Sequence, residues 1–155
     1  MIHVLFVCLG NICRSPMAEA VFRHLVQEEE LDSLISIDSA GIGGWHAGNP
    51  PHHGTCQVLT EKGISHEGLR ARQITPADFS AFDYIVCMDE ENLAALTKMA
   101  PSGVQVYKLL DFAGHLAERD VEDPYYTGRF DYVYQLVEAG CRGLLEDIKK
   151  RKIAS

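Results

Sequence analysis

A thiol, a guanidinium and a hydroxyl lie within one short segment near the N-terminus, Cys8-Leu9-Gly10-Asn11-Ile12-Cys13-Arg14-Ser15. The five residues between Cys8 and Arg14 allow the backbone to wrap around a tetrahedral anion, so that successive N–H groups point at its oxygen atoms. Arg14 offers a planar pair of donors that can hold two phosphoryl oxygens. Gly10 permits a tight path. The segment therefore predicts a phosphate-binding loop in which Cys8 attacks phosphorus.

Ser15 and the residues after it support this interpretation. A helix that begins near Ser15, with Pro16 at its first position, directs the positive end of its dipole at the loop and favours both a bound dianion and a thiolate at Cys8. The hydroxyl of Ser15 can stabilise the thiolate and later the leaving sulfur. A bare cysteine-x5-arginine spacing also occurs by chance, and Cys8 could then be a buried core thiol. The coincidence of a strand end, a glycine and a helix start favours the phosphate-binding loop.

Hydrolysis of a phosphate ester also needs a proton donor for the leaving oxygen. The best candidate is Asp123, in the segment Glu122-Asp123-Pro124-Tyr125-Tyr126, where Pro124 fixes the backbone and the two tyrosines could form the wall of a cleft. An Asp-Pro pair alone is more often a turn. Asp89 is a rival carboxylate, although its position predicts a cap for the helix that follows.

Alternating strands and helices are expected to position these residues. The predicted strands are short and apolar: Ile2–Cys8, Ser33–Asp38, Asp83–Met88 and Val104–Leu109. The predicted helices begin near Ser15, Gly54, Thr75, Glu90 and Phe130. This order predicts a single α/β domain with a four-stranded parallel sheet and helices on both faces, a doubly wound, flavodoxin-like fold. Ligands of such sheets bind beyond the carboxyl ends of the strands, where Cys8 lies.

The composition excludes several classes of protein. Of the 155 residues 46% are hydrophobic and 23% are charged, and the formal net charge of −8 argues against nucleic acid as a partner. No stretch is long and apolar enough to predict a membrane span, so no membrane partner is expected. The five cysteines lack the spacing of a secreted disulfide framework, and we expect reduced thiols and a cytoplasmic protein.

Taken together, the motifs resemble those of the low-molecular-weight protein tyrosine phosphatases over essentially the whole chain. Their active-site signature is Val-Cys-Leu-Gly-Asn-Ile-Cys-Arg-Ser-Pro-Met-Ala-Glu at residues 7–19, and their acid loop is Asp-Pro-Tyr-Tyr at 123–126. Other segments that fall in family order are Asp38–Gly41, Trp45, Asn49–His52 and Asp83–Asp89. The resemblance implies one phosphatase domain over residues 1–155 with the phosphatase I-like fold.

The resemblance also implies hydrolysis of phosphotyrosine in proteins, and of small aryl phosphates, through a phosphocysteine intermediate and without a metal or other cofactor. In it Cys8 is the nucleophile, Arg14 binds phosphate, and Asp123 is the general acid and then the base. The residues implied to bind the substrate, phosphate or another oxyanion are Leu9, Gly10, Asn11, Ile12, Cys13, Ser15, Trp45, Tyr125 and Tyr126. Asn11 and Ser39 would hold the loop in its conformation.

Two details of the resemblance concern regulation and support of the loop. Cys13 resembles the family's second loop thiol, which can form a reversible disulfide with Cys8 and protect it from further oxidation. Family members often extend the Asn11 network to a histidine, but Gly68-Leu69-Arg70 stand at that place here. Whether His66 takes the place of that histidine in the Asn11 network stays open.

Rival functions fit the residues less well. An arsenate reductase needs a relay of further thiols, and Cys87 has no partner six or so residues on. Protein-arginine phosphatases resemble this family but carry threonine where the chain has Ile12, so tyrosine is favoured. A phosphopeptide-binding pseudophosphatase would lack one of the three catalytic residues. The remaining alternative is a metal site built from His46, His52, His53 and Cys56, whose spacing matches no structural zinc pattern.

Overall fold

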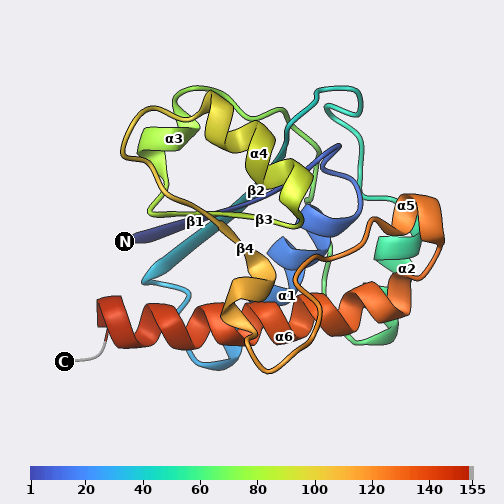
Figure 1. Ribbon diagram of the computed structural model, residues 1–155. Helices are drawn as coiled ribbons and strands as arrows, with labels where there is room; N and C mark the ends of the chain where they lie inside the picture. The colour runs from blue at the N-terminus through green and yellow to red at the C-terminus, as the bar shows by residue number, and fades with distance from the viewer. Residues whose placement is uncertain (154–155) are drawn as a thin grey trace.

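A four-stranded parallel sheet forms the centre of the molecule, with the strand order β2-β1-β3-β4 (Figure 1). The computed structural model describes residues 1–153. The strands are β1 (Ile2–Cys8), β2 (Ile35–Gly41), β3 (Tyr84–Cys87) and β4 (Val106–Lys108). β1 lies at the centre of the sheet, because it pairs with β2 on one side and with β3 on the other.

Helices cover both faces of this sheet, as the doubly wound prediction requires (Figure 1). Their bounds are α1 (Arg14–Glu28), α2 (His53–Glu61), α3 (Asp78–Ala81), α4 (Glu90–Met99), α5 (Pro124–Thr127) and α6 (Phe130–Ile148), with a 3-10 turn η1 (Leu109–Phe112) and a π-helical turn η2 (Lys149–Ile153). One face of the sheet packs on α1 and α6, and the other packs on α3 and α4.

The alternation of side chains along β1 divides the core into these two layers. Val4, Phe6 and Cys8 point into the layer that contains α1 and α6. Leu5 and Val7 point into the layer that contains α4. Because β1 is buried on both faces, its sequence reads as a continuous apolar run, which is typical of the centre of a parallel sheet.

Several element boundaries differ from the sequence-based expectation, and those nearest the site are described here. β2 runs to Gly41 rather than ending at Asp38, because its register with β1 pairs Gly41 with Cys8. α1 already begins at Arg14, so Pro16 is its third residue, where a missing N–H still costs no hydrogen bond. The short helix α5 lies between η1 and α6 and is not among the predicted helices.

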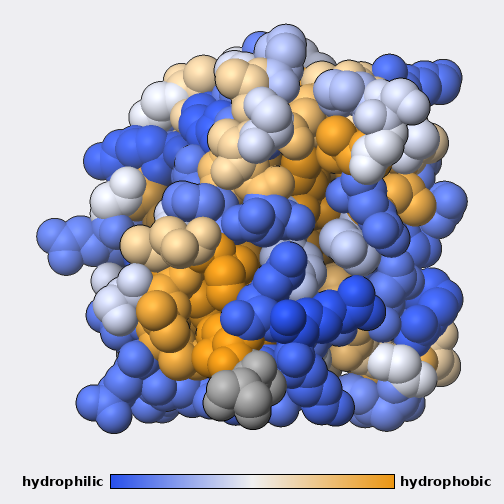
Figure 2. Space-filling model, turned by 90° about the vertical axis from the view of Figure 1, so that its left-hand side faces the viewer, coloured by the Kyte–Doolittle hydropathy of each residue, from blue (hydrophilic) through white to orange (hydrophobic). Residues whose placement is uncertain are grey.

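Met1 and the end of η2 lie on the side where the strands begin (Figure 1). Figure 2 shows this side: charged and polar side chains cover most of it, with a group of apolar side chains among them. The carboxyl ends of the strands lie on the opposite side of the molecule (Figure 1). No helix among residues 1–153 is long and apolar enough to cross a membrane.

Candidate active site

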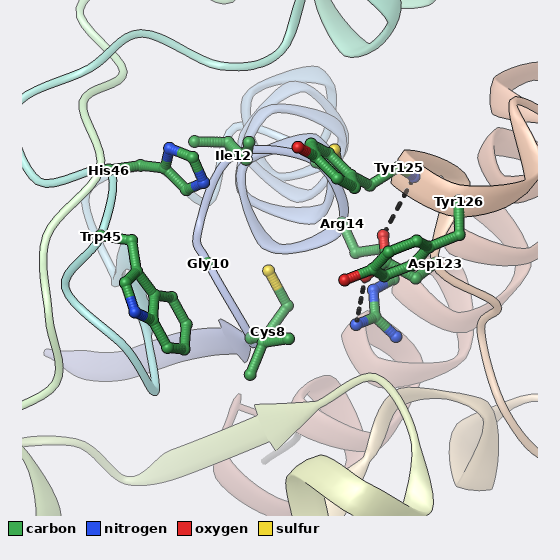
Figure 3. Close-up of a pocket in the computed structure, with 11 residues that line it drawn as sticks. Cys8, Gly10, Ile12, Arg14, Trp45, His46, Asp123, Tyr125 and Tyr126 are labelled. Carbon is green, nitrogen blue, oxygen red and sulfur yellow. Dashed lines mark hydrogen bonds and ion pairs between the residues drawn. The ribbon is translucent and has the colours of Figure 1, made fainter.

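A cavity of about 320 Å³ opens at the carboxyl end of β1 (Figure 3). The residues that line it come from three separate segments: Cys8, Leu9, Gly10, Ile12, Cys13, Arg14, Trp45, His46, Asp123, Tyr125 and Tyr126. Three further predicted residues, Asn11, Ser15 and Ser39, lie buried behind its floor. The structure therefore brings the two predicted loops together, although their sequences are more than a hundred residues apart.

The floor of the cavity is the loop that joins β1 to α1. The backbone N–H groups of residues 9–15 donate to no acceptor within residues 1–153, and no side chain caps the start of α1. Asn11 adopts a left-handed conformation with φ of 60°. Gly10 has no positive φ; a Cβ atom there would lie 3.2 Å from the ring of His46, so its small size matters rather than a special turn. A row of free donors at a helix start is a binding site for an anion.

Hydrogen bonds behind this loop determine which group faces the sulfur of Cys8. Asn11 Oδ1 accepts the backbone N–H of Arg72 at 3.0 Å, which fixes the orientation of the amide because a backbone N–H can only donate. Asn11 Nδ2 therefore donates to the hydroxyls of Ser15, at 2.7 Å, and Ser39, at 3.0 Å. The hydroxyl of Ser15 lies 3.0 Å from Cys8 Sγ and can donate its own proton to the sulfur when Cys8 is a thiolate. The network thus presents a donor to the sulfur, and such a donor stabilises a thiolate.

The network ends on Glu19, a residue for which no separate role was predicted. Ser39 Oγ donates to Glu19 Oε1 at 2.6 Å, and Glu19 is only 9% exposed. Burial raises the pKa of Glu19, while the hydrogen bond from Ser39 opposes this effect. His66 takes no part, because its Nε2 pairs with the hydroxyl of Thr60 at 3.2 Å. Glu19 therefore ends the network in this chain.

The raised pKa of Glu19 predicts how stability depends on pH. The folded state holds the proton more tightly than the unfolded state, so the stabilisation is complete below the ordinary carboxyl value of 4.5 and is lost as the pH rises through the raised pKa. Glu19→Gln keeps an oxygen acceptor for Ser39 and does not titrate. We expect the variant to gain in thermal unfolding midpoint relative to the parent as the pH rises from about 4 to about 8. A difference that stays constant over this range would contradict the assignment.

Arg14 is held in place by groups from the two neighbouring loops. Its guanidinium donates to Asp89 Oδ2 at 2.5 Å and to the carbonyl oxygen of Val121 at 2.9 Å, and it lies 3.4 Å from Asp123 Oδ2. Burial lowers the pKa of Arg14, but Cys8, Asp89 and Asp123 together raise it, so the side chain stays charged. The guanidinium is therefore preorganised at the rim of the anion site.

Asp89 has two roles, of which the sequence predicted one. Its Oδ1 accepts the backbone N–H of Asn92 at 2.8 Å, so it caps α4 as expected. Its Oδ2 pairs with Arg14, a contact between residues 75 positions apart that local pattern cannot reveal. Asp89 is thus a support for Arg14.

Asp123 caps the start of α5 and faces the cavity beside Arg14 (Figure 3). Its Oδ1 accepts the backbone N–H of Tyr125 at 3.1 Å. The segment before it is tied to the sheet, because the N–H of Val121 donates to the carbonyl oxygen of Met88 at 2.8 Å. Pro124 is the first residue of α5, a position that suits its fixed φ. A carboxyl group is therefore held over the cavity from the side opposite Trp45 (Figure 3).

Exposed aromatic rings form the walls of the cavity. Trp45 stands on one side, and Tyr125 and Tyr126 stand on the other (Figure 3). The exposed fractions of the three residues are 69%, 54% and 76%. The Trp45 ring packs on Gly43, where a Cβ atom would come within 2.0 Å of it. Aromatic walls of this kind contribute to binding a flat ring.

His46 also lines the cavity, and this position differs from its sequence-based interpretation. Together with His52, His53 and Cys56 it was a candidate metal ligand, but residues 1–153 contain no group of three or more His, Cys, Asp or Glu side chains placed to hold a metal ion. His52 instead stacks on Phe130, with ring centroids 5.1 Å apart. The proximity of His46 to Trp45 in the sequence is the only signal that could have placed it at the site.

The second thiol of the loop, Cys13, differs electrostatically from an ordinary surface cysteine. Burial, together with the charges of Cys8 and Asp123, raises the pKa of Cys13 to about 12, although Arg14 opposes this shift. Both loop cysteines are free thiols in the structure. Cys13 is therefore protonated at neutral pH.

Comparison with known proteins decides the family. The sequence matches the low molecular weight phosphotyrosine protein phosphatases over residues 3–154. The chain belongs to this family. A low molecular weight protein-tyrosine-phosphatase of Bacillus subtilis (strain 168), YfkJ, is 53% identical over 154 residues, which cover 98% of this chain and 99% of YfkJ. The crystal structure of YfkJ superposes with a TM-score of 0.96, covering 98% of this chain and 97% of YfkJ.

Two other solved members of this phosphatase fold bear on the site. A protein tyrosine phosphatase from Entamoeba histolytica, solved with Hepes in its active site, is 33% identical with a TM-score of 0.93, and the match covers 99% of this chain and all of that one. An arginine phosphatase from Drosophila is 35% identical with a TM-score of 0.88, covering 96% of this chain and 99% of that one. The low molecular weight phosphatase fold expected from the sequence is confirmed by these structures.

Proposed function

We propose that this member of the low molecular weight phosphatase family hydrolyses phosphotyrosine through a phosphocysteine intermediate, with Cys8 as nucleophile, Arg14 as phosphate ligand and Asp123 as general acid and base. The observation that carries the proposal is the convergence of these three side chains on one cavity. The phosphoryl group binds to the free N–H groups of residues 9–15 and to Arg14.

In the first step the thiolate of Cys8 attacks phosphorus in line with the ester oxygen. The S–P bond forms, the P–O bond to the tyrosyl ring breaks, and Asp123 gives its proton to the leaving oxygen. In the second step water attacks phosphorus, Asp123 takes a proton from the water, the P–S bond breaks and the thiolate of Cys8 returns. Arg14 and the loop amides hold the equatorial oxygens throughout.

Tyrosine is the preferred leaving group for two reasons. The aromatic side chains of Trp45 and Tyr125 flank the cavity and suit a phenyl ring. The side chain of Ile12 offers no hydrogen-bonding group to the substrate, so a guanidinium substrate would have unpaired donors there. The likeness to an arginine phosphatase makes phosphoarginine the second candidate.

A comparison of substrates tests the proposed function. We expect phosphotyrosine peptides to be hydrolysed with a kcat/KM at least about ten-fold above that of matched phosphoarginine and phosphoserine peptides, because the site is shaped for an aryl leaving group. Turnover should be the same with and without EDTA. Preferential hydrolysis of phosphoarginine would show that the protein is an arginine phosphatase instead. Loss of activity with EDTA would overturn the metal-free mechanism.

A further inference from the structure

A second hollow, of about 370 Å³, adjoins the catalytic cavity on the side of α4. The two share Leu9, Arg14, Asp123 and Tyr126 as common walls. The remaining lining residues of the hollow are Ile42, Asp89, Glu91, Asn92 and Ala95. We call it the α4 hollow. A ligand bound in the α4 hollow would therefore lie directly beside a phosphoryl group bound to Arg14.

The walls of the α4 hollow carry more negative than positive charge. Arg14 is the single cation among them, and it faces both Asp89 and Asp123. Glu91 is exposed and forms no ion pair within residues 1–153. Its neighbour Glu90, by contrast, pairs with Lys108 at 3.0 Å and does not line the hollow. The walls therefore keep a net negative charge, and Glu91 is the carboxylate among them that has no ion pair within residues 1–153.

A buried amide supplies a second, independent sign of a ligand. Asn92 lines the hollow and is only 3% exposed. Its Oδ1 accepts the backbone N–H of Met88 at 3.2 Å, which leaves Nδ2 as a donor without a partner among residues 1–153. No fully buried side-chain N or O atom among residues 1–153 lacks a partner, so Nδ2 keeps some contact with the solvent of the hollow. It can therefore donate to an acceptor from outside, such as a peptide carbonyl.

We propose that the α4 hollow binds a lysine or arginine side chain close to the phosphotyrosine of the substrate, with Glu91 as the specificity-determining charge and Asn92 Nδ2 as donor to the peptide backbone. The inference rests on the proposed function and names the class of peptide that the site takes. An extended peptide advances about 3.3 Å per residue, so a cation one or two positions from the phosphotyrosine reaches a hollow that shares walls with the catalytic cavity. An acidic side chain there would meet Glu91 and be repelled.

The test measures kcat/KM on phosphotyrosine peptides that differ only in having Lys, Gln or Glu at each of the two positions before and after the phosphotyrosine. At the favoured position we expect the order Lys, Gln, Glu with about two- to five-fold between successive peptides, the effect of one exposed charge pair. The preference should shrink in high salt. In Glu91→Gln the kcat/KM values of the Lys and Gln peptides should become nearly equal. In Glu91→Lys the order of the three kcat/KM values should reverse.

The matched control is Glu90→Gln, which removes the same charge from the adjacent position of the same helix but outside the hollow. It should keep the parental ratio between the Lys and Gln peptides. Equal rates for the three peptides at every position in the parent, or an unchanged ratio in Glu91→Gln, would overturn the inference while leaving phosphotyrosine hydrolysis in place. Failure to hydrolyse any phosphotyrosine peptide would instead overturn the proposed function.

Discussion

Cys8→Ser is expected to lower kcat for p-nitrophenyl phosphate by a factor of at least about 10⁴, because a serine hydroxyl at this position is a far weaker nucleophile than a thiolate. The anion site should remain, since the free N–H groups of residues 9–15 and the guanidinium of Arg14 do not depend on the sulfur. Steady-state kinetics measures the first effect, and calorimetric titration with inorganic phosphate measures the second.

Cys56→Ser is the matched control for this variant. Cys56 is a free thiol in α2 that does not line the catalytic cavity, so the same change of sulfur to oxygen should leave turnover near the parental rate. A Cys8→Ser protein that keeps turnover would exclude Cys8 as the nucleophile. A protein that neither turns over nor binds phosphate would show that the substitution had damaged the loop.

Asp123→Ala is expected to slow the enzyme by about 10²- to 10⁴-fold on phenyl phosphate, the usual contribution of a general acid. The loss should be much smaller on p-nitrophenyl phosphate, because a stabilised phenolate leaves without a proton. The measurement is kcat/KM for a series of aryl phosphates, plotted against the pKa of the leaving phenol, and the slope should become steeper in the variant.

Asp120→Ala provides the comparison for this second change. Asp120 lies in the same segment of the chain, but its carboxylate pairs with Lys108 at 2.9 Å and does not line the catalytic cavity. Its removal should leave the slope unaltered. Equal losses on all leaving groups in Asp123→Ala would mean that Asp123 only shapes the start of α5.

The parts of the site that consist of residues adjacent in the chain could be predicted from the sequence. The segment from Cys8 to Ser15 carries its strand end, its anion-binding backbone and its helix start within a few positions, so the loop was predictable. This prediction needed only local rules for strands, turns and helix starts. Asp123 was the best candidate for the proton donor, but an Asp-Pro pair alone is more often a turn, and the acid loop was named from the family resemblance.

The remaining parts of the site depend on contacts across the fold. Glu19 meets Ser39 only because α1 packs against β2, and Asp89 meets Arg14 only because β3 lies beside β1. The left-handed conformation of Asn11 is likewise held by the backbone of Arg72, which is 61 positions away. Residue pattern within a segment carries no information about such distances, which is why these roles were missed or left open.

The long reach of the Asn11 hydrogen bonds also has a consequence for how the protein acquires its activity. The loop is braced by Ser39, 28 positions away, and by Arg72, 61 positions away, and Arg14 is braced by Asp89, 75 positions away. Contacts of such separation form late in folding, because the chain loses entropy when a long loop closes, before the new contacts stabilise it. A folding intermediate with only β1 and α1 in place would contain the entire signature and still lack a working site.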